Sequence, residues 1–204
     1  MTRRSILLAS ASPRRQELLR SLGLSFAVEP ADVDETEFDG EAALPYVERV
    51  ASAKADEIAS RRDDLEGVVV LAADTTVDVD GAILAKPVDD DDARRMLRLL
   101  AGRTHHVHTA VVCRHVGGVG AVTVTTGVTF AALDDADIDW YVGRGEHRDK
   151  AGAYGMQYLA EATIPDMEPR GLTPQALQAL SEARKQDVRE LVDLGDGHRR
   201  GQRP

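Results

Sequence analysis

The most constraining feature of the chain is an uncharged run, Gly-Val-Val-Val-Leu-Ala-Ala at positions 67–73, which is followed by Asp74. A continuous apolar run of this length is typical of a central strand that is covered on both faces. Around it alternate helix-like segments near 13–22 and 44–61 and strand-like segments at 105–113 and 121–133. The Asp80-Gly81 pair predicts a hairpin turn, and residues 173–192 predict a C-terminal helix. This order indicates an α/β domain.

Length and composition suit one such domain. The chain has 204 residues, 43% of them apolar, enough for a single core or for two lobes around a cleft. We expect residues 1–194 to form one domain and the polar, glycine-rich residues 195–204 to be a disordered tail. The single cysteine, Cys113, excludes an intrachain disulfide, and its apolar neighbours predict a buried, unreactive thiol.

The charge of the chain limits its partners. A formal net charge of −10 argues against general affinity for nucleic acids or anionic membranes, which attract basic patches. No apolar stretch approaches the length of a membrane span, and the opening residues are too quickly interrupted for a signal peptide. We therefore expect a cytoplasmic protein with neither a nucleic-acid nor a membrane partner.

The first turn of the chain offers donors for an anion. A short apolar run ends at Ser10, Ser12 suits a helix N-cap, and Pro13 suits the first helical position. Arg14 and Arg15 then lie where the helix dipole disfavours cations. Free N–H groups, two hydroxyls and two guanidiniums at this turn predict a phosphate site. The alternative is that both arginines are surface charges paired with nearby acids.

Asp74 is a candidate functional carboxylate, because we expect the central strand to end at this residue. Burying a carboxylate is costly unless it is paired, hydrogen-bonded or metal-bound, and α/β sheets bind ligands beyond the carboxyl ends of their strands. The alternative is that Asp74 caps its own turn through Thr75 or Thr76. Lys54 interrupts the apolar stripe of its predicted helix, and Lys86 precedes a proline. Either lysine taken alone is more typical of the surface.

Acids and histidines raise the question of a metal. The loop at 29–42 is rich in acids, and one or two of them can share Mg²⁺ with a bound triphosphate, the rest being solvated. These acids are Asp32, Asp34, Glu35 and Glu37. His105, His106 and His108 resemble a zinc site. We assign His106 to the strand face opposite the other two and reject zinc.

Five motifs together resemble the Maf family of nucleoside triphosphate pyrophosphatases. They are LASASPRRQELLRSLG at 8–23, AADTTV at 72–77, KP at 86–87, ARRMLRLLAGRTHHVHTAV at 93–111 and DKAGAYGMQ at 149–157. The resemblance covers about three quarters of the chain, in family order and spacing. Within the family, ADT combined with KAGAYG-x-Q resembles the branch that acts on dTTP and UTP.

The resemblance implies a fold and an activity. It implies an elongated α/β fold, similar to inosine triphosphate pyrophosphatase, with a mixed sheet, flanking helices and a cleft between two lobes. It implies hydrolysis between the α- and β-phosphates with Mg²⁺ or Mn²⁺, by a homodimer. The rival hypotheses are a nucleotide-binding regulator of cell division without turnover, associated with septum formation, and a structural cell-division protein.

The resemblance also implies roles for individual residues. Asp74 would be the proton acceptor or, alternatively, a metal ligand, and Glu35 would supply a carboxylate on the metal side. The residues that bear on substrate choice would be Arg14, Thr75 and Gln157. The phosphate contacts would be Ser10, Ser12, Arg15, Lys54, Lys86 and Lys150.

The chain departs from the family after Gln157. The family continues there through a strand and turn into an Asn-Val-Val-Gly-Leu-Pro stretch, which this sequence lacks. The base-pocket and dimer contacts of that last strand are therefore not predicted here. This departure is consistent with a regulator, whereas the retained Asp74, lysines and arginine pair favour an enzyme.

Overall fold

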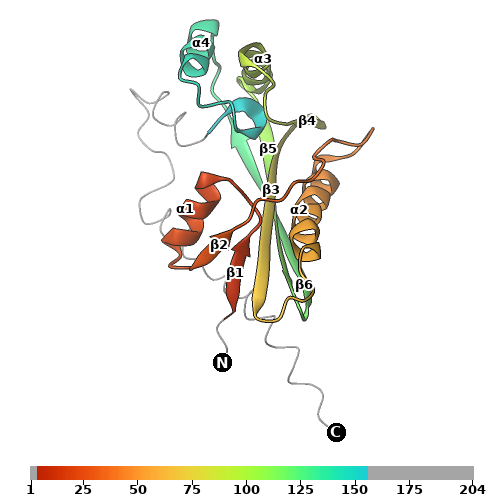
Figure 1. The fold of residues 1–204 in the computed structure, drawn as a ribbon. Helices are drawn as coiled ribbons and strands as arrows, with labels where there is room; N and C mark the ends of the chain where they lie inside the picture. Colours follow the sequence, from red (N-terminus) through yellow and green to blue (C-terminus); the bar gives the residue numbers. More distant parts are fainter. Residues whose placement is uncertain (1–3, 156–204) are drawn as a thin grey trace.

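A computed structural model describes residues 4–155 of the chain (Figure 1). The strands are β1 (Ser5–Leu8), β2 (Phe26–Val28), β3 (Val68–Val79), β4 (Ala82–Leu84), β5 (Thr104–His115) and β6 (Gly118–Thr129). The helices are α1 (Pro13–Ser21), α2 (Ala43–Ser60), α3 (Asp90–Leu100), α4 (Asp135–Gly143) and a short 3-10 helix, η1 (Ala151–Ala153). Within this part of the chain, no helix combines the length and apolar character needed to cross a bilayer.

The strands form one mixed sheet in the order β2-β1-β3-β5-β6, with β4 paired to β3. β1 is parallel to both of its neighbours, whereas β3, β5 and β6 are antiparallel in turn. The α/β prediction, with a mixed sheet and flanking helices, is confirmed. Residue 157, the predicted C-terminal helix and the tail at 195–204 lie outside the described residues.

β3 is longer than the apolar run predicted. It continues through Asp74 to Val79, because β5 pairs with it from Val70 to Asp78 regardless of side-chain polarity. The expectation that a strand ends at Asp74 is therefore wrong, and so is the alternative that Asp74 caps a turn. The strand that ends here is β1, whose pairing with β3 stops at Leu71. Asp74 thus lies beyond the carboxyl end of β1, where β3 no longer pairs with β1.

A tight turn closes the β3–β4 hairpin, as the Asp80-Gly81 pair predicts. Both residues have positive φ, 52° and 83°, which glycine and aspartate tolerate better than most residues. The Asp78 carboxylate accepts a hydrogen bond from the Gly81 N–H at 2.9 Å. The chain reverses direction at this turn, and Lys86 follows shortly after β4.

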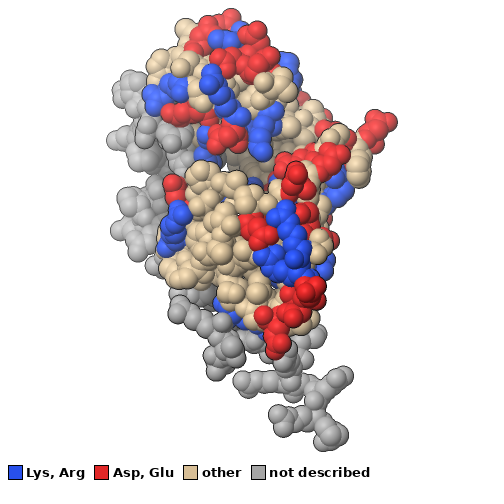
Figure 2. Space-filling view, in the orientation of Figure 1, with Lys and Arg blue, Asp and Glu red and all other residues tan. Residues whose placement is uncertain are grey.

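Two hydrophobic cores lie at opposite ends of β3. The first core packs α2 against the sheet and includes Val70 and Ala72 of β3. The second core joins α3, α4 and η1 to Val77 and Val79 of the same strand. Residues 74–76 stand between the two cores, which form the lower and upper parts of the molecule in Figure 1. Figure 2 shows the surface hollowed between these parts, with Lys and Arg side chains beside the hollow.

The histidine assignment needs a correction. Alternation with a period of two places residues 106 and 108 on one face, and residue 105 on the other. The rings of His106 and His108 are indeed stacked, with centroids 6.1 Å apart. His105 is buried beside the second core, its Nε2 2.6 Å from the Tyr154 hydroxyl. Cys113 is buried as expected, and burial raises the pKa of its thiol to about 11.

Candidate active site

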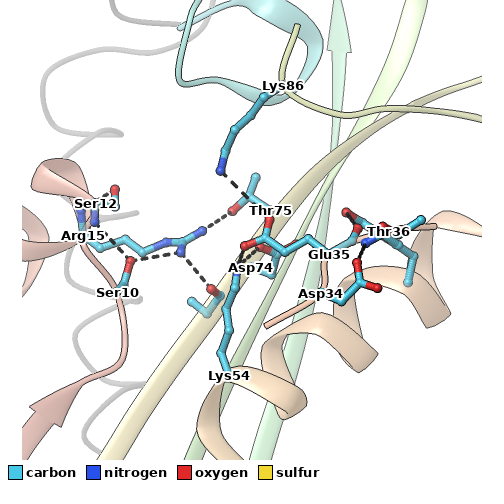
Figure 3. A network of polar contacts seen from close by, with 12 residues as sticks. Ser10, Ser12, Arg15, Asp34, Glu35, Thr36, Lys54, Asp74, Thr75 and Lys86 are labelled. Carbon is cyan, nitrogen blue, oxygen red and sulfur yellow. Dashed lines mark hydrogen bonds and ion pairs between the residues drawn. The ribbon is translucent and has the colours of Figure 1, made fainter. Parts of the chain in front are cut away.

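A buried lysine holds two carboxylates at the centre of the site. Lys54 Nζ lies 2.7 Å from Asp74 Oδ1 and 2.7 Å from Glu35 Oε1 (Figure 3). Lys54 is 8% exposed and Asp74 is 6% exposed. The interruption of the α2 apolar stripe is therefore directed inward, toward the sheet, and not to the surface. The Glu35–Lys54–Asp74 triad carries one net negative charge.

Glu35 is the acid of the 29–42 loop that reaches this centre. Its second oxygen, Oε2, lies 4.0 Å from Nζ of Lys86, an exposed side chain that extends from the segment between β4 and α3. Burial raises the pKa of Glu35, but the hydrogen bond from Lys54 and the charges of Lys54, Lys86 and Arg15 outweigh it. The pKa of Glu35 is therefore below its ordinary value. Cations from three separate elements converge on this carboxylate.

The two adjacent arginines differ in their surroundings. Arg15 is half-buried and donates hydrogen bonds to the Ala73 carbonyl at 2.8 Å and the Ser10 hydroxyl oxygen at 3.3 Å. A longer bond of 3.5 Å reaches Thr75 Oγ1. Burial lowers the pKa of Arg15, while the charges of Asp74 and Glu35 oppose that shift. Arg15 therefore already ties α1 to β3.

The N-terminal turn of α1 has the predicted cap. Pro13 is the first helical residue, and the Ser12 hydroxyl oxygen accepts a hydrogen bond from the Arg15 N–H at 3.5 Å. The Ser10 hydroxyl oxygen accepts another from the Ser12 N–H at 3.2 Å. These bonds fix the turn at the end of β1 and aim it toward Asp74.

Arg14 faces a different group. It is exposed and makes no hydrogen bond or ion pair within residues 4–155. A Cβ placed on Gly155 would lie 3.3 Å from Arg14 Nη2 and 2.9 Å from Lys150 Cε, so both cations flank this glycine. Lys150 Nζ donates to Asp149 Oδ1 at 2.7 Å and to the Glu146 carbonyl. Arg14 and Lys150 therefore form a second cationic group, contributed from the two sides of the hollow.

The predicted site residues fall into two sets. The structure gathers one set around Asp74: Ser10, Ser12, Arg15, Glu35, Lys54, Thr75 and Lys86. A second set, Arg14 and Lys150, meets at Gly155. Thr75 hydrogen-bonds to Thr109 across the β3–β5 ladder, with 3.1 Å between the hydroxyl oxygens. Gln157 lies outside the described residues.

Sequence reasoning missed Tyr46. Its hydroxyl donates a hydrogen bond to the Glu35 carbonyl at 2.9 Å. Burial, followed by the negative charges of Asp74 and Glu35, raises the pKa of Tyr46 to about 12. The signal was helical spacing, because positions 46, 50 and 54 share one face of a helix. Tyr46 therefore lies on the same stripe as Lys54.

The donor set suits a cation that is shared with phosphate. Within the described part of the chain, no three His, Cys, Asp or Glu side chains converge on one point. Glu35 and Asp74 do meet, through a common Lys54 ammonium. Mg²⁺ is typically bound by one or two carboxylates, with substrate phosphates and water completing its shell. Two carboxylates beside the cations Arg15 and Lys86 therefore fit such an ion better than they fit an all-protein cage.

Comparison with known proteins identifies the family. The sequence model of the family described as Maf-like protein matches residues 5–170. A dTTP/UTP pyrophosphatase of Anaeromyxobacter dehalogenans strain 2CP-1 is 52% identical over 166 residues, covering 79% of this chain and 82% of that protein. One of Hahella chejuensis is 46% identical, covering 81% and 83%. The solved structure of the Staphylococcus aureus Ham1 protein has a TM-score of 0.46 and 15% identity, with coverage of 89% of this chain and 100% of that one, which is too low a similarity for comparing sites. The family match includes every described residue of the site, and the chain belongs to the family of Maf-like proteins.

Proposed function

We propose that this chain hydrolyses dTTP and UTP to the nucleoside monophosphate and pyrophosphate. One observation carries the proposal: the Glu35–Lys54–Asp74 triad, in which Lys54 and Asp74 are buried, lies beside further cations and inside the segment shared with relatives named dTTP/UTP pyrophosphatase. Phosphoryl transfer depends mainly on positioning and charge neutralisation, and this site is built from groups that do both. We also propose that the enzyme is cytoplasmic and that it forms a homodimer.

The cations are arranged to take a polyphosphate along the hollow. Lys86 is exposed, and Arg14 makes no hydrogen bond or ion pair within residues 4–155, so both side chains would be available to phosphate oxygens. The N–H groups at the first turn of α1 add donors in the same direction. Lys150 would approach from the opposite side of the hollow, beside Arg14. Arg15 would act from its fixed place between Ser10 and Ala73.

In this proposal Asp74 would take the proton of the attacking water. Lys54 holds its Oδ1, and Oδ2 would accept the proton as the water oxygen bonds to the α-phosphorus. The bond from that phosphorus to the bridging oxygen breaks, and pyrophosphate leaves. A divalent cation, Mg²⁺ or Mn²⁺, held by Glu35 with or without Asp74, would supply Lewis-acid stabilisation of the phosphate charge.

The direct test is pyrophosphate release from a panel of nucleotides: dTTP, UTP, dCTP, dATP and dGTP. With Mg²⁺ or Mn²⁺ present, kcat/KM should be highest for dTTP and UTP, and a chelator should stop the reaction. A purine at the top of the ranking would overturn the pyrimidine assignment but leave the pyrophosphatase intact. Nucleotide binding without pyrophosphate release from any member would instead support the non-catalytic regulator.

Lys86→Ala should raise KM and lower kcat together, because its charge would act on phosphates whose charge is redistributed during cleavage. Steady-state kinetics with dTTP measures both constants. Arg98→Ala is the matched control, since Arg98 is also exposed but pairs α3 with Asp135 of α4 and lies outside the residue set around Asp74. Unchanged KM and kcat in Lys86→Ala would remove Lys86 from the phosphate site.

A further inference from the structure

The loop that carries Glu35 is tied to α2 through its backbone. Residues 34–41, here called the Glu35 loop, contain no helix or strand. Two successive carbonyls in it are nevertheless bound by side chains of α2. The Glu35 carbonyl accepts from the Tyr46 hydroxyl at 2.9 Å, and the Thr36 carbonyl accepts from Arg49 Nη2 at 3.0 Å. The backbone on the C-terminal side of Glu35 therefore has two anchors.

Arg49 also closes the far end of the same loop. Its Nε and Nη2 donate to the two carboxylate oxygens of Glu41, each at 2.7 Å. Glu41 in turn accepts the Phe38 N–H at 3.1 Å, and the guanidinium lies 3.9 Å from the centre of the Phe38 ring. The hydrogen bond from Arg49 holds the pKa of Glu41 below its ordinary value. Such a forked contact requires the planar guanidinium, which lysine lacks.

One helix thus supplies three contacts that locate Glu35. Lys54 holds its carboxylate, while Tyr46 and Arg49 hold the backbone on which that carboxylate is mounted. α2 is itself fixed by the buried stripe of the first core. A side chain on an irregular loop gains a defined position only when its surroundings limit its freedom.

We propose that Tyr46 and Arg49 are positioning residues that present the Glu35 carboxylate to the substrate and its cation. The inference rests on the proposed function, since it assigns Glu35 a role in binding the metal–nucleotide complex. Supporting residues of this kind typically change metal affinity or activity about 10- to 100-fold when they are altered. Tyr46→Phe removes only a hydroxyl, and Arg49→Lys keeps the charge but loses the fork.

The test is a double-mutant cycle on Glu35. Tyr46→Phe and Arg49→Lys are each made in the wild-type chain and in a Glu35→Gln background. The first readout is the dissociation constant of the Mn²⁺ complex of a dTTP analogue with an imido group between the α- and β-phosphates. The second is kcat/KM for dTTP. Urea unfolding of every variant monitors folding separately.

Both single variants should weaken binding of the Mn²⁺ complex and lower kcat/KM, each by about 10- to 100-fold. In the Glu35→Gln background they should cause little further loss in binding, because the group they position is already gone. Arg61→Lys is the control, since Arg61 also joins the end of α2 to a glutamate, Glu29, but away from the site. It should bind and turn over substrate as the wild type does.

Three results would separate the hypotheses. Wild-type affinity and turnover in Tyr46→Phe and Arg49→Lys would overturn the inference while leaving the proposed function standing. Equal losses in both backgrounds would also overturn it, because they indicate a general structural effect. A wild-type chain that binds the analogue without hydrolysing dTTP would contradict the proposed function, and the binding cycle would still decide the positioning role.

Discussion

Asp74→Asn should lower kcat for dTTP by ~10²–10⁴, the usual contribution of a general base, while nucleotide binding is retained. Asparagine has nearly the same shape and can still accept the Lys54 hydrogen bond through its amide oxygen. It cannot take a proton from water. The expected variant therefore folds and binds nucleotide but turns it over poorly.

Rapid-mix measurement of pyrophosphate release gives the rate, and titration with the imido analogue gives the affinity. Asp78→Asn is the matched control, because Asp78 lies four residues further along β3 on the same face, bonded to the hairpin turn. Turnover of dTTP at the wild-type rate by Asp74→Asn would remove Asp74 from the chemistry. The Mn²⁺ affinity of the variant separates the two roles: unchanged affinity supports a base, and a large loss supports a metal ligand.

Lys54→Met should reduce the free energy of unfolding by about 3–5 kcal/mol, the usual effect of removing one partner from a buried ion pair. The loss comes mainly from Asp74, which is left buried without its cation. Glu35 is more exposed, so water screens its share of the effect. Urea unfolding at neutral pH measures the change. Lys86→Met is the control, because an exposed ammonium 4.0 Å from its partner should change stability by at most about 0.5 kcal/mol.

The pH dependence of this loss has a definite sign. The pKa of Glu35 is lowered in the folded chain, so its ion pair contributes stability at pH values above the unfolded pKa. That contribution disappears as pH falls through the folded pKa. In Lys54→Met the hydrogen bond and charge of Lys54 no longer counteract burial, so the pKa of Glu35 rises. Protonation of Glu35 then relieves part of the loss in free energy of unfolding. The difference in free energy of unfolding between the wild type and Lys54→Met should therefore decrease as the solution is acidified below about pH 4.5. A difference that stays constant with pH would contradict the ion-pair explanation.

The parts of the structure that have a regular period could be predicted from the sequence. The apolar stripe gave α2 to within a residue at each end, and the Asp80-Gly81 pair gave the β3–β4 hairpin. Strand ends were harder to predict, because pairing with β5 carries β3 through Asp74 although the apolar run stops there. The backbone ladder, and not side-chain polarity, sets that end. The error on the histidines had a different cause. The strand period of two was known, but His106 was assigned to the wrong face.

The sequence predicted which residues form the candidate site better than it predicted how they are arranged. Nothing local distinguishes Arg14 from Arg15, yet only Arg15 turns toward the Ala73 carbonyl. Glu35 stands among similar acids in an aperiodic loop, and only the family resemblance favoured it. Its position depends on Tyr46, whose hydroxyl acts across a distance in sequence that no local pattern reveals. Side chains that anchor loops are found only when the fold brings them together.

The continuity of β3 and β5 limits how this enzyme can move. Both strands pass from one core to the other, and their ladder is unbroken across Asp74. A hinge needs residues whose φ and ψ can change, and here those angles are fixed by interstrand hydrogen bonds. The two lobes, one around each hydrophobic core, are therefore not separate bodies that close over a nucleotide by a hinge motion. Partial unfolding around one core would disturb the ladder that supports the other.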